Sequence, residues 1–590
     1  MSGTNMARPD SKGQTSQCVG DSRFRLIRIE HRILQVSQAL LLLFSVSVLT
    51  YLHRAGWPSH SPLKLAPHPS ASPPDLLGLA KSHLEWTSCG DRFQCASLPV
   101  PLDYLNDEDN RTASIAITRY LASKQDASTG TVIFNPGGPG GSGTGSTYRL
   151  GPVLDEILEG QYDILGFDPR GINMTSPAVS CMSSVASRSA LQYILGSTAP
   201  SLNPHDIGIW DSVAQLIAEE CEANSGADIL PFVNTPTVAR DIASIVDAIH
   251  AEKRHRVSYW GFSYGTNLGA IFTALFPNKL HRIILDGIRS PLDAREIYAW
   301  GYTSLASQND IFEGYFEICE KVGPSRCPLA GLEKSAKTTV MDLLDSLYER
   351  PLPVSAPQVT GLVTFFDYKE FFYGTLYQPR SWLLFSEITR DLLKGNGTSF
   401  LLATDPGPAG FGSMEAGTAV LCTDADPATH YSLESWSDYV FNMTELSFIG
   451  GDSRSLVTLP CRHWYSIPSE RWSGSFEDVH LETPVLMIAN TYDPATPIAS
   501  AKRLLENMGD NAVLLEQHSY GHCSVSSLST CTYQVVLDYL LRGHLPHPGT
   551  VCEVDDKEYG GYFPFPKGEK ALDRNPLEKV LERFVDEIRQ

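Results

Sequence analysis

Residues 256–266 read RVSYWGFSYGT, which places a serine between two glycines directly after a short apolar run. The run 256–260 predicts a strand, and the small-residue segment that follows the serine predicts a helix through Leu275. A sharp turn between a strand and a helix holds a serine hydroxyl clear of the backbone, and glycines are needed beside it because a side chain there would collide with its neighbours. Ser263 is therefore the candidate nucleophile, with an ordinary glycine-rich turn as the alternative.

Strand-like and helix-like patterns alternate around this turn. Strands are predicted at 97–104, 114–122, 131–134, 162–167, 282–285, 484–488 and 512–517, and helices at 238–250 and 498–508. Such alternation predicts an α/β fold, with a mostly parallel sheet and helices on both faces. Between about 290 and 480 the chain is instead helix-like, rich in aromatic residues and broken by Pro and Gly. We interpret this stretch as a cap inserted into the core, although 590 residues could also hold several domains.

A serine hydroxyl becomes a good nucleophile only when a base removes its proton. His522 is the best placed histidine, because it lies in 519–522 (SYGH), directly after the last predicted strand. Three other histidines lie nearer the serine in sequence, on predicted helices or strand ends, where surface or capping roles are more typical: His250, His255 and His281.

The base in turn needs a carboxylate that fixes its tautomer and stabilises its charged form. Asp493, in 489–497 (ANTYDPATP), follows the penultimate predicted strand. The three residues then occur along the chain as serine, acid and histidine, which is the order expected when the nucleophile lies at a turn between a strand and a helix. Asp424 and Asp426 are possible substitutes, but both fall inside the predicted cap.

Backbone amides must also point at the oxygen that becomes negative during acyl transfer. The amide of Tyr264, directly after the serine, is one candidate. The second is expected in the glycine-rich segment 135–143 (NPGGPGGSG), at Gly138 with Gly137 next to it.

The same glycine-rich segment has a competing interpretation. Residues 138–143 fit the pattern G-x-G-x-x-G, with Asp163 and Asp168 downstream, as in some dinucleotide sites. However, no G-K-[ST] follows, and a nucleotide site would leave Ser263 and its partners unexplained. For Asp168 and Arg170 we expect a buried ion pair that braces this loop rather than a catalytic role.

The N-terminus differs in kind from the rest of the chain. Residues 33–52 contain no charged side chain and are long enough for a helix to cross a bilayer. Many cations precede them and few follow, which predicts residues 1–32 in the cytosol and the body of the protein on the far side. A cleaved signal peptide and a buried core helix are the alternatives. The Pro- and Ser-rich segment 53–82 is typical of a stalk.

The cysteines agree with an oxidising compartment. Eleven of the twelve lie beyond the apolar segment, and none forms a zinc-like C-x-x-C pair. The full connectivity cannot be read from sequence, but three spacings would close short loops: Cys89 with Cys95, Cys319 with Cys327, and Cys523 with Cys531. Four N-x-[ST] sequons could accept glycans, at Asn110, Asn173, Asn396 and Asn442.

Charge and composition exclude some classes of function. The formal net charge of −21 argues against a nucleic-acid surface, which needs clustered Lys and Arg. We expect no metal or organic cofactor, because the base and the backbone donors would supply the activation.

Together, these motifs resemble the proline iminopeptidase and tripeptidyl aminopeptidase family of α/β-hydrolases. The resemblance covers about residues 83–545 and rests on five stretches: 135–140 (NPGGPG), 166–171 (GFDPRG), 260–266 (WGFSYGT), 493–497 (DPATP) and 521–523 (GHC). With the alternation described above, this gives an α/β-hydrolase core at 83–289 and 481–545, a cap at 290–480 and a C-terminal extension at 546–590.

The resemblance also implies an activity. Members release residues or short peptides from a free N-terminus, so peptide substrates and an acyl-enzyme on Ser263 are expected. In the family, acidic side chains of the cap bind the substrate's ammonium group. Glu415 and Asp424 are candidates by location, since no motif fixes them.

Two other functions remain open. The same three side chains could serve an esterase or lactonase acting on a small metabolite. The chain could also be a catalytically silent binding ectodomain that retains the fold.

Overall fold

The computed structural model describes residues 84–125, 129–251, 256–404, 410–426, 432–477, 479–555, 561–563 and 576–589. The predicted cytosolic tail, membrane segment and stalk, residues 1–82, lie outside these ranges. None of the helices that the structure describes is both long enough and apolar enough to cross a membrane. The described residues, from Leu84 onward, belong to one compact unit.

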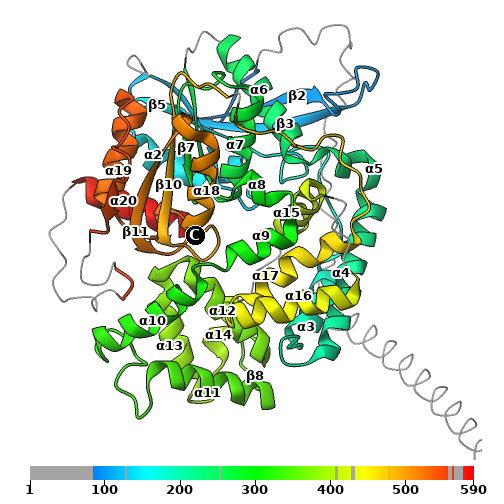
Figure 1. The fold of residues 1–590 in the computed structure, drawn as a ribbon, viewed down its shortest axis with the longest axis vertical. Helices are drawn as coiled ribbons and strands as arrows, with labels where there is room; N and C mark the ends of the chain where they lie inside the picture. Colours follow the sequence, from blue (N-terminus) through cyan, green and yellow to red (C-terminus); the bar gives the residue numbers. More distant parts are fainter. Residues whose placement is uncertain are drawn as a thin grey trace, which may run out of the picture. The chain divides into compact units, whose positions relative to one another are not determined.

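A ten-stranded sheet is the centre of this unit, with its strands in the order β1-β2-β3-β5-β4-β6-β7-β10-β11-β12 (Figure 1). The pairs β1·β2, β2·β3 and β3·β5 are antiparallel, and every pair from β5 to β12 is parallel. The strands are β1 (Thr87–Gly90), β2 (Phe93–Pro101), β3 (Thr112–Tyr120), β4 (Gly130–Asn135), β5 (Tyr162–Phe167), β6 (Val257–Phe262), β7 (Ile283–Asp286), β10 (Val485–Tyr492), β11 (Ala512–Tyr520) and β12 (Val551–Glu553).

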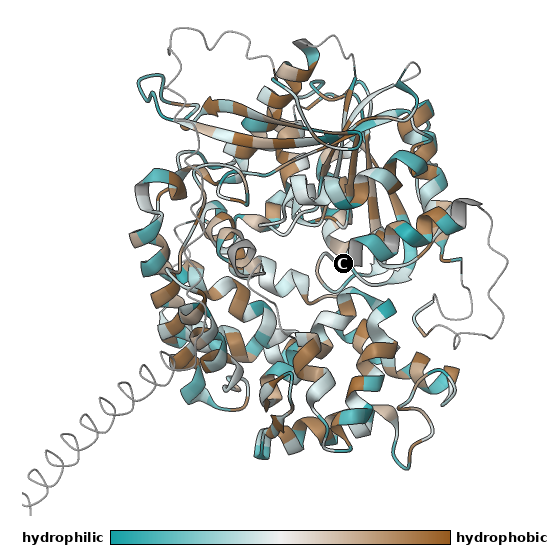
Figure 2. Cartoon of the chain, turned by 180° about the vertical axis from the view of Figure 1, so that it is seen from behind, coloured by the Kyte–Doolittle hydropathy of each residue, from teal (hydrophilic) through white to brown (hydrophobic). Residues whose placement is uncertain are grey.

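The central strands are apolar on both faces because helices cover both. Alternate residues of β6 enter different cores: Tyr259 packs with one cluster and Trp260 with the other. Figure 2 shows these strands mostly in the hydrophobic colour. The first face carries α6 (Thr235–Ala251), α7 (Tyr264–Leu275) and α18 (Ile498–Met508), and the second carries α2 (Gly143–Ile157), α19 (Thr530–Leu537) and α20 (Pro576–Arg589). The predicted α/β-hydrolase fold class is confirmed.

Between β7 and β10 the chain builds a helical layer, drawn in green and yellow in Figure 1. It also contains a two-stranded hairpin, β8 (Leu352–Ser355) with β9 (Thr360–Val363). Its helices are α8 (Pro291–Ala294), α9 (Ile297–Ser304), α10 (Gln308–Val322), α11 (Ala336–Glu349), α12 (Phe365–Tyr377), α13 (Trp382–Leu392), α14 (Thr398–Thr404), α15 (Gly410–Asp424), α16 (Leu433–Leu446) and α17 (Gly451–Thr458).

A second part of the chain joins this layer. The helices α3 (Val185–Gly196), α4 (Pro204–Asn224) and α5 (Gly226–Ile229) leave the sheet after β5, and α4 lies beside α16 while α3 contacts α12 (Figure 1). Trp210 of α4 packs against Phe366 and Trp436, at ring-centroid distances of 5.4 and 6.5 Å. The cap is therefore built from two segments, of which the sequence pattern indicated one.

The sheet continues past residue 545, where we expected the core to end. β12 pairs in parallel with β11 through Glu516 and Val551. The ring of Phe584, on α20, lies 6.3 Å from that of Trp260. The C-terminal segment thus contributes both a strand and a covering helix.

The described residues contain five disulfides: Cys89–Cys95, Cys181–Cys221, Cys319–Cys327, Cys422–Cys461 and Cys531–Cys552. The predicted pairs Cys89–Cys95 and Cys319–Cys327 are confirmed, but Cys523–Cys531 is wrong. Cys523 is a buried free thiol whose Sγ lies 3.4 Å from the carbonyl oxygen of Asp286. Cys531 belongs to α19 and is bonded to Cys552 of β12 instead, so the two sulfurs point to different parts of the structure.

Candidate active site

Ser263 lies at the turn between β6 and α7, with φ 55° and ψ −122°. This backbone conformation is rarely populated by residues other than glycine, and it persists only where neighbouring contacts hold it. Here the Ser263 amide donates to the carbonyl of Asp286 at 2.9 Å, and the Ser263 carbonyl accepts from the amide of Thr266 at 2.9 Å. A Cβ on Gly261 would meet the Gly265 carbonyl oxygen at 2.5 Å, so the turn requires a glycine there.

His522 and Asp493 form a hydrogen-bonded pair. The Nδ1 atom of His522 lies 3.0 Å from each carboxylate oxygen of Asp493. Asp493 is fully buried and accepts further bonds from the amides of Ala495, Thr496 and Cys523, at 2.8 to 2.9 Å. Burial raises the pKa of Asp493, but the nearby His522 and these hydrogen bonds outweigh it and hold the pKa below its ordinary value. The ionised carboxylate orients the ring so that Nε2 remains for a reacting hydroxyl.

Backbone contacts bring the serine turn and the histidine loop together. β6, β7, β10 and β11 are parallel neighbours, so their carboxyl ends meet at one edge of the sheet. The carbonyl of Asp286, at the end of β7, receives both the amide of Ser263 and the thiol of Cys523. Among the residues described, no hydrogen bond joins the Ser263 hydroxyl to the His522 ring. Catalytic hydrogen bonds of this kind are often long in a free enzyme and tighten when substrate binds.

The glycine-rich loop after β4 packs directly on the serine turn. A Cβ on Gly137 would lie 2.3 Å from the Phe262 carbonyl oxygen, 3.0 Å from the Cβ of Ser263 and 3.1 Å from the amide nitrogen of Tyr264. The Gly137 amide already donates to Oδ1 of Asn135 at 3.0 Å. Of the two predicted loop donors, the Gly137 amide is thus already bonded within the loop, and Gly138 remains the candidate for the oxyanion donor beside Tyr264.

Asp168 braces this loop, although not through the predicted ion pair. Arg170 pairs instead with the buried Asp241, at 2.8 Å. Asp168 accepts hydrogen bonds from residues at the start of α2, namely Ser142 at 2.7 Å and the Thr144 hydroxyl at 2.8 Å, and from Asn173 at 2.9 Å. The expectation of an Asp168–Arg170 pair is wrong, because Arg170 turns toward α6 and away from the loop.

The other histidines and acids considered for the base and its carboxylate lie away from the Asp493–His522 pair. His250 is exposed at the end of α6, His281 precedes β7 at the opposite edge of the sheet, and His255 is outside the described residues. Asp426 lies 3.9 Å from Arg295, and within the described part of the chain neither Asp424 nor Asp426 contacts His522.

The two cap acids, both on α15, make separate contacts. Asp424 accepts from the Thr235 amide at 2.7 Å, and the Thr235 hydroxyl lies 2.6 Å from that of Tyr264. Burial raises the pKa of Asp424 to about 6.

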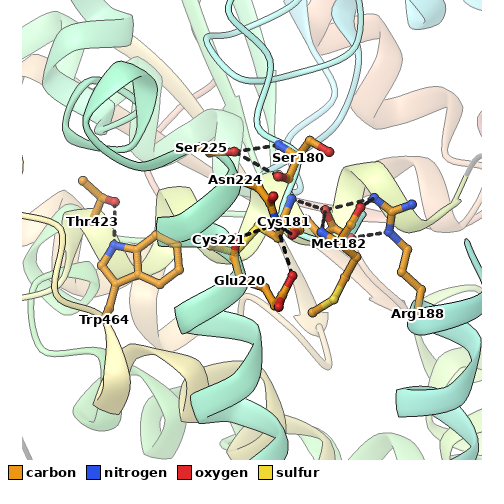
Figure 3. The surroundings of a disulfide bond; sticks show 11 residues. Ser180, Cys181, Met182, Arg188, Glu220, Cys221, Asn224, Ser225, Thr423 and Trp464 are labelled. Carbon is orange, nitrogen blue, oxygen red and sulfur yellow. Dashed lines mark hydrogen bonds and ion pairs between the residues drawn. A yellow bond between two sulfur atoms is a disulfide. The ribbon is translucent and has the colours of Figure 1, made fainter. Parts of the chain in front are cut away.

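Glu415 lies at the other end of the same helix. It is bound by the amide of Cys181 at 2.6 Å and by the guanidinium of Arg188. Figure 3 shows this loop beside the Cys181–Cys221 bridge. Asp424 is therefore linked through Thr235 to the phenol hydroxyl of Tyr264, whereas Glu415 is committed to the 181–188 loop.

Two cap residues and one strand residue near the histidine were missed in the sequence. The ring of Tyr377 lies 5.3 Å from that of His522, and the Tyr377 carbonyl accepts the His522 amide at 2.9 Å. Arg454 donates to the Tyr377 hydroxyl at 2.6 Å. Asp286 is buried, and burial raises its pKa to about 7 although Ser524 donates to it. No motif marks them; the only signal was the charge of Asp286 at the end of the apolar run 283–285.

Asp493, His522 and Cys523 also offer three possible metal-ligand atoms within 4.8 Å of one another. A metal would need a thiolate, but burial raises the pKa of Cys523 well above its ordinary value. Both oxygens of Asp493 are already occupied by hydrogen-bond donors. This donor set fits an oriented base better than a metal centre.

The fold and this site define the class: the protein is a serine hydrolase of the α/β-hydrolase fold. Residues 447–552 match the family described as TAP-like protein. Serine protease Hip1 of Mycobacterium tuberculosis is 26% identical over 495 residues, covering 80% of this chain and 91% of that protein. Tripeptidyl aminopeptidase of Streptomyces lividans is 26% identical over 505 residues, covering 80% and 87%. The resemblance predicted from the motifs is confirmed.

Two other similarities complete the comparison. Carboxylesterase B of M. tuberculosis is 27% identical over 498 residues, covering 79% of this chain and 89% of that protein. Among solved structures, a proline iminopeptidase of Mycobacterium smegmatis is 13% identical, with a TM-score of 0.30, and covers 75% of this chain and 97% of that chain.

Proposed function

We propose that this protein is a serine peptidase that releases residues or short peptides from the free N-terminus of peptide substrates. The observation that carries the proposal is the pair formed by the part-buried His522 and the buried Asp493 at the same sheet edge as Ser263. Similarity to a serine protease and a tripeptidyl aminopeptidase over four fifths of the chain supports peptides as the substrate class.

In the proposed reaction, the Ser263 hydroxyl attacks the scissile carbonyl carbon while Nε2 of His522 takes its proton. The amides of Tyr264 and Gly138 stabilise the oxyanion, and Asp493 stabilises the imidazolium. His522 then protonates the leaving amine, and an acyl-enzyme on Ser263 remains. A water molecule, deprotonated by His522, hydrolyses this ester and restores the serine.

Recognition of the N-terminus requires a carboxylate near the acyl site. We assign this role to Asp424, because its contacts run through Thr235 to Tyr264. Glu415 was the other predicted candidate, but the ion pair with Arg188 already neutralises it. Asp424→Asn should raise KM for peptides with a free N-terminus more than it lowers kcat, while Glu415→Gln should mainly lower thermal stability.

The direct test offers the same peptide with a free and with an acetylated N-terminus. We expect cleavage of the free peptide only, and release of its N-terminal part as seen by mass spectrometry. Equal turnover of both peptides would remove the exopeptidase assignment while leaving the hydrolase class intact.

An esterase is the second candidate, and the similarity to a carboxylesterase favours it specifically. A panel of p-nitrophenyl esters and aminoacyl amides separates the two functions. Much faster cleavage of all esters, with no measurable amide cleavage, would favour the esterase. A silent ectodomain predicts neither activity nor labelling of Ser263 by a fluorophosphonate.

The five disulfides indicate an extracellular or secreted protein. We further propose that residues 33–52 anchor it as a single-pass membrane protein, with a cleaved signal peptide as the alternative. All four sequon asparagines are exposed, which supports glycosylation. Asn173 is the least suitable, because its side chain donates to Asp168 at 2.9 Å.

A further inference from the structure

Arg289 is a buried arginine behind the nucleophile turn. It lies three residues after β7 and is 4% exposed. None of its three guanidinium nitrogens has a hydrogen-bond partner among the residues described. An arginine remains charged in proteins, and a buried charge without a counterion is costly.

A second buried arginine faces the same indole. Arg454, on α17, is 6% exposed and donates to the Tyr377 hydroxyl and to the Pro494 carbonyl, at 2.6 and 3.4 Å, while its Nε has no partner in the described ranges. The guanidinium carbons of Arg289 and Arg454 lie 4.7 and 5.3 Å from the centroid of the Trp300 ring. Two cations thus converge on one aromatic side chain.

The nearby acids do not neutralise Arg289 by direct contact. Asp424 and Asp293 attract it, but within the described residues neither forms an ion pair with it. Asp424 is bound by Thr235, and Asp293 pairs with Arg503. The positive charge of Arg454 repels the guanidinium group of Arg289. The two guanidinium groups therefore lack an ion-pair partner among the described residues, which an anion from outside the chain would supply.

Both arginines are connected to the candidate catalytic residues. The Arg289 amide donates to the Thr266 hydroxyl at 2.8 Å, and this hydroxyl donates to the Ser263 carbonyl at 2.6 Å. On the other side, Arg454 holds Tyr377, whose ring contacts His522. An anion bound between the arginines would thus lie on the side of the site where Tyr377 contacts His522.

We propose that Arg289 and Arg454 form a subsite that binds a carboxylate of the peptide substrate. The inference rests on the proposed peptidase function and adds a substrate class to it. A guanidinium matches a carboxylate through two parallel hydrogen bonds. The carboxylate could be the C-terminus of a short peptide or an Asp or Glu side chain, which share this chemistry.

The test uses a matched set of short peptides with free N-termini. One arm compares a C-terminal acid with the C-terminal amide, and the other compares Glu with Gln at each position in turn. For the wild-type protein, we expect one of the two arms to show a preference. In that arm, kcat/KM should be at least about tenfold higher for the peptide with the carboxylate than for its amide counterpart, as a charge-assisted pair implies. The arm that shows the preference identifies the source of the carboxylate.

Variants then assign the preference to Arg289. Arg289→Met should abolish it, and Arg289→Lys should retain part of it, because an ammonium group keeps the charge without the planar fork. Arg240→Met is the matched control: Arg240 is paired with Glu470 at 2.8 Å and should leave the preference unchanged. Since Arg289→Met breaks no side-chain hydrogen bond within the described ranges, its melting temperature should not fall by more than that of the control.

Fluorophosphonate labelling of Ser263 distinguishes failure of the subsite from failure of the peptidase function. If the wild-type protein is labelled and cleaves peptides, but prefers no carboxylate by more than twofold, the subsite is overturned. The subsite is equally overturned if folded Arg289→Met keeps the full preference. If the wild-type protein cleaves no peptide, the proposed peptidase function fails first, and the carboxylate inference fails with it.

Discussion

At the scale of single residues, the strained backbone of Ser263 and the glycines around it determine the site. A positive φ at a serine costs about 1–3 kcal/mol, and it is retained here because the strand, the helix and the loop after β4 all contact the turn. Gly137 fills the narrow space beside the turn, within van der Waals reach of Phe262 and Tyr264.

Gly137→Ala should therefore lower kcat strongly. Its Cβ would be placed 2.3 Å from the Phe262 carbonyl oxygen, so the loop or the serine turn must move. Loss of one oxyanion donor costs about 10² to 10³ in kcat, and we expect a decrease of this order in steady-state kinetics.

Gly395→Ala is the matched control, because Gly395 also has a positive φ, of 77°, but no heavy atom lies within 4 Å of its Cβ position. It should lose stability without losing kcat. Wild-type kcat in a folded Gly137→Ala protein would mean that the loop does not shape the oxyanion site.

Asp286 predicts a pH dependence of stability. Burial raises its pKa to about 7, whereas the unfolded chain loses this proton near the ordinary value of 3.8. Between these pH values the unfolded state is increasingly favoured, so the contribution of Asp286 to stability falls as pH rises and levels off above about 7. Asp286→Asn should reduce the fall in unfolding free energy between pH 5 and 7, as measured by urea denaturation with the disulfides intact. Parallel curves for both proteins would refute this assignment.

At the scale of elements, the candidate residues come from three strands whose carboxyl ends share one edge. The strands were predictable because their apolar runs are short, buried on both faces and bounded by Gly or Pro. The placement of Asp493 and His522 follows from the same logic, since each comes directly after such a run. Strand order and cap packing depend on contacts between distant segments, such as Trp210 with Trp436, which local patterns do not contain.

The cysteine pairing shows the same limit. A short spacing indicated a Cys523–Cys531 bridge. Whether two cysteines can bond depends on the direction of their side chains, and Cys523 points at β7. Peptide mapping without reduction should find Cys531 linked to Cys552 and residue 523 as a free thiol that reacts with maleimide only after unfolding. A peptide that links residues 523 and 531 would contradict the described fold around α19.

At the scale of the whole molecule, a cap from two chain segments covers the sheet edge that carries the site. Its acids and arginines were only partly predictable. Asp424 was found by its position in the cap, whereas Arg289 and Arg454 carry no motif and acquire meaning only from their burial without an ion-pair partner in the part of the chain that the structure describes. The proposed substrate-recognising groups are thus the part of the site that was least predictable from the sequence.

The N-terminal segment gives a prediction for the intact protein. Because residues 33–52 lack charge and follow a cationic stretch, the full chain should remain in the membrane pellet after alkaline carbonate extraction. A variant that lacks residues 33–52 should instead be recovered in the supernatant. Recovery of the full chain in the supernatant with an intact N-terminus would contradict the anchor, and recovery with a shortened N-terminus would establish the cleaved signal.

The central claim is that Ser263, His522 and Asp493 act as one catalytic unit. Its most direct measurement is kcat on one peptide substrate for the wild-type protein and for Ser263→Ala, His522→Ala and Asp493→Asn, with fluorophosphonate labelling located by mass spectrometry. We expect the label on Ser263, losses of at least about 10³-fold for the first two variants, and a similar or smaller loss for the third. Near-wild-type turnover in a folded His522→Ala protein, or a label on another serine, would contradict the claim.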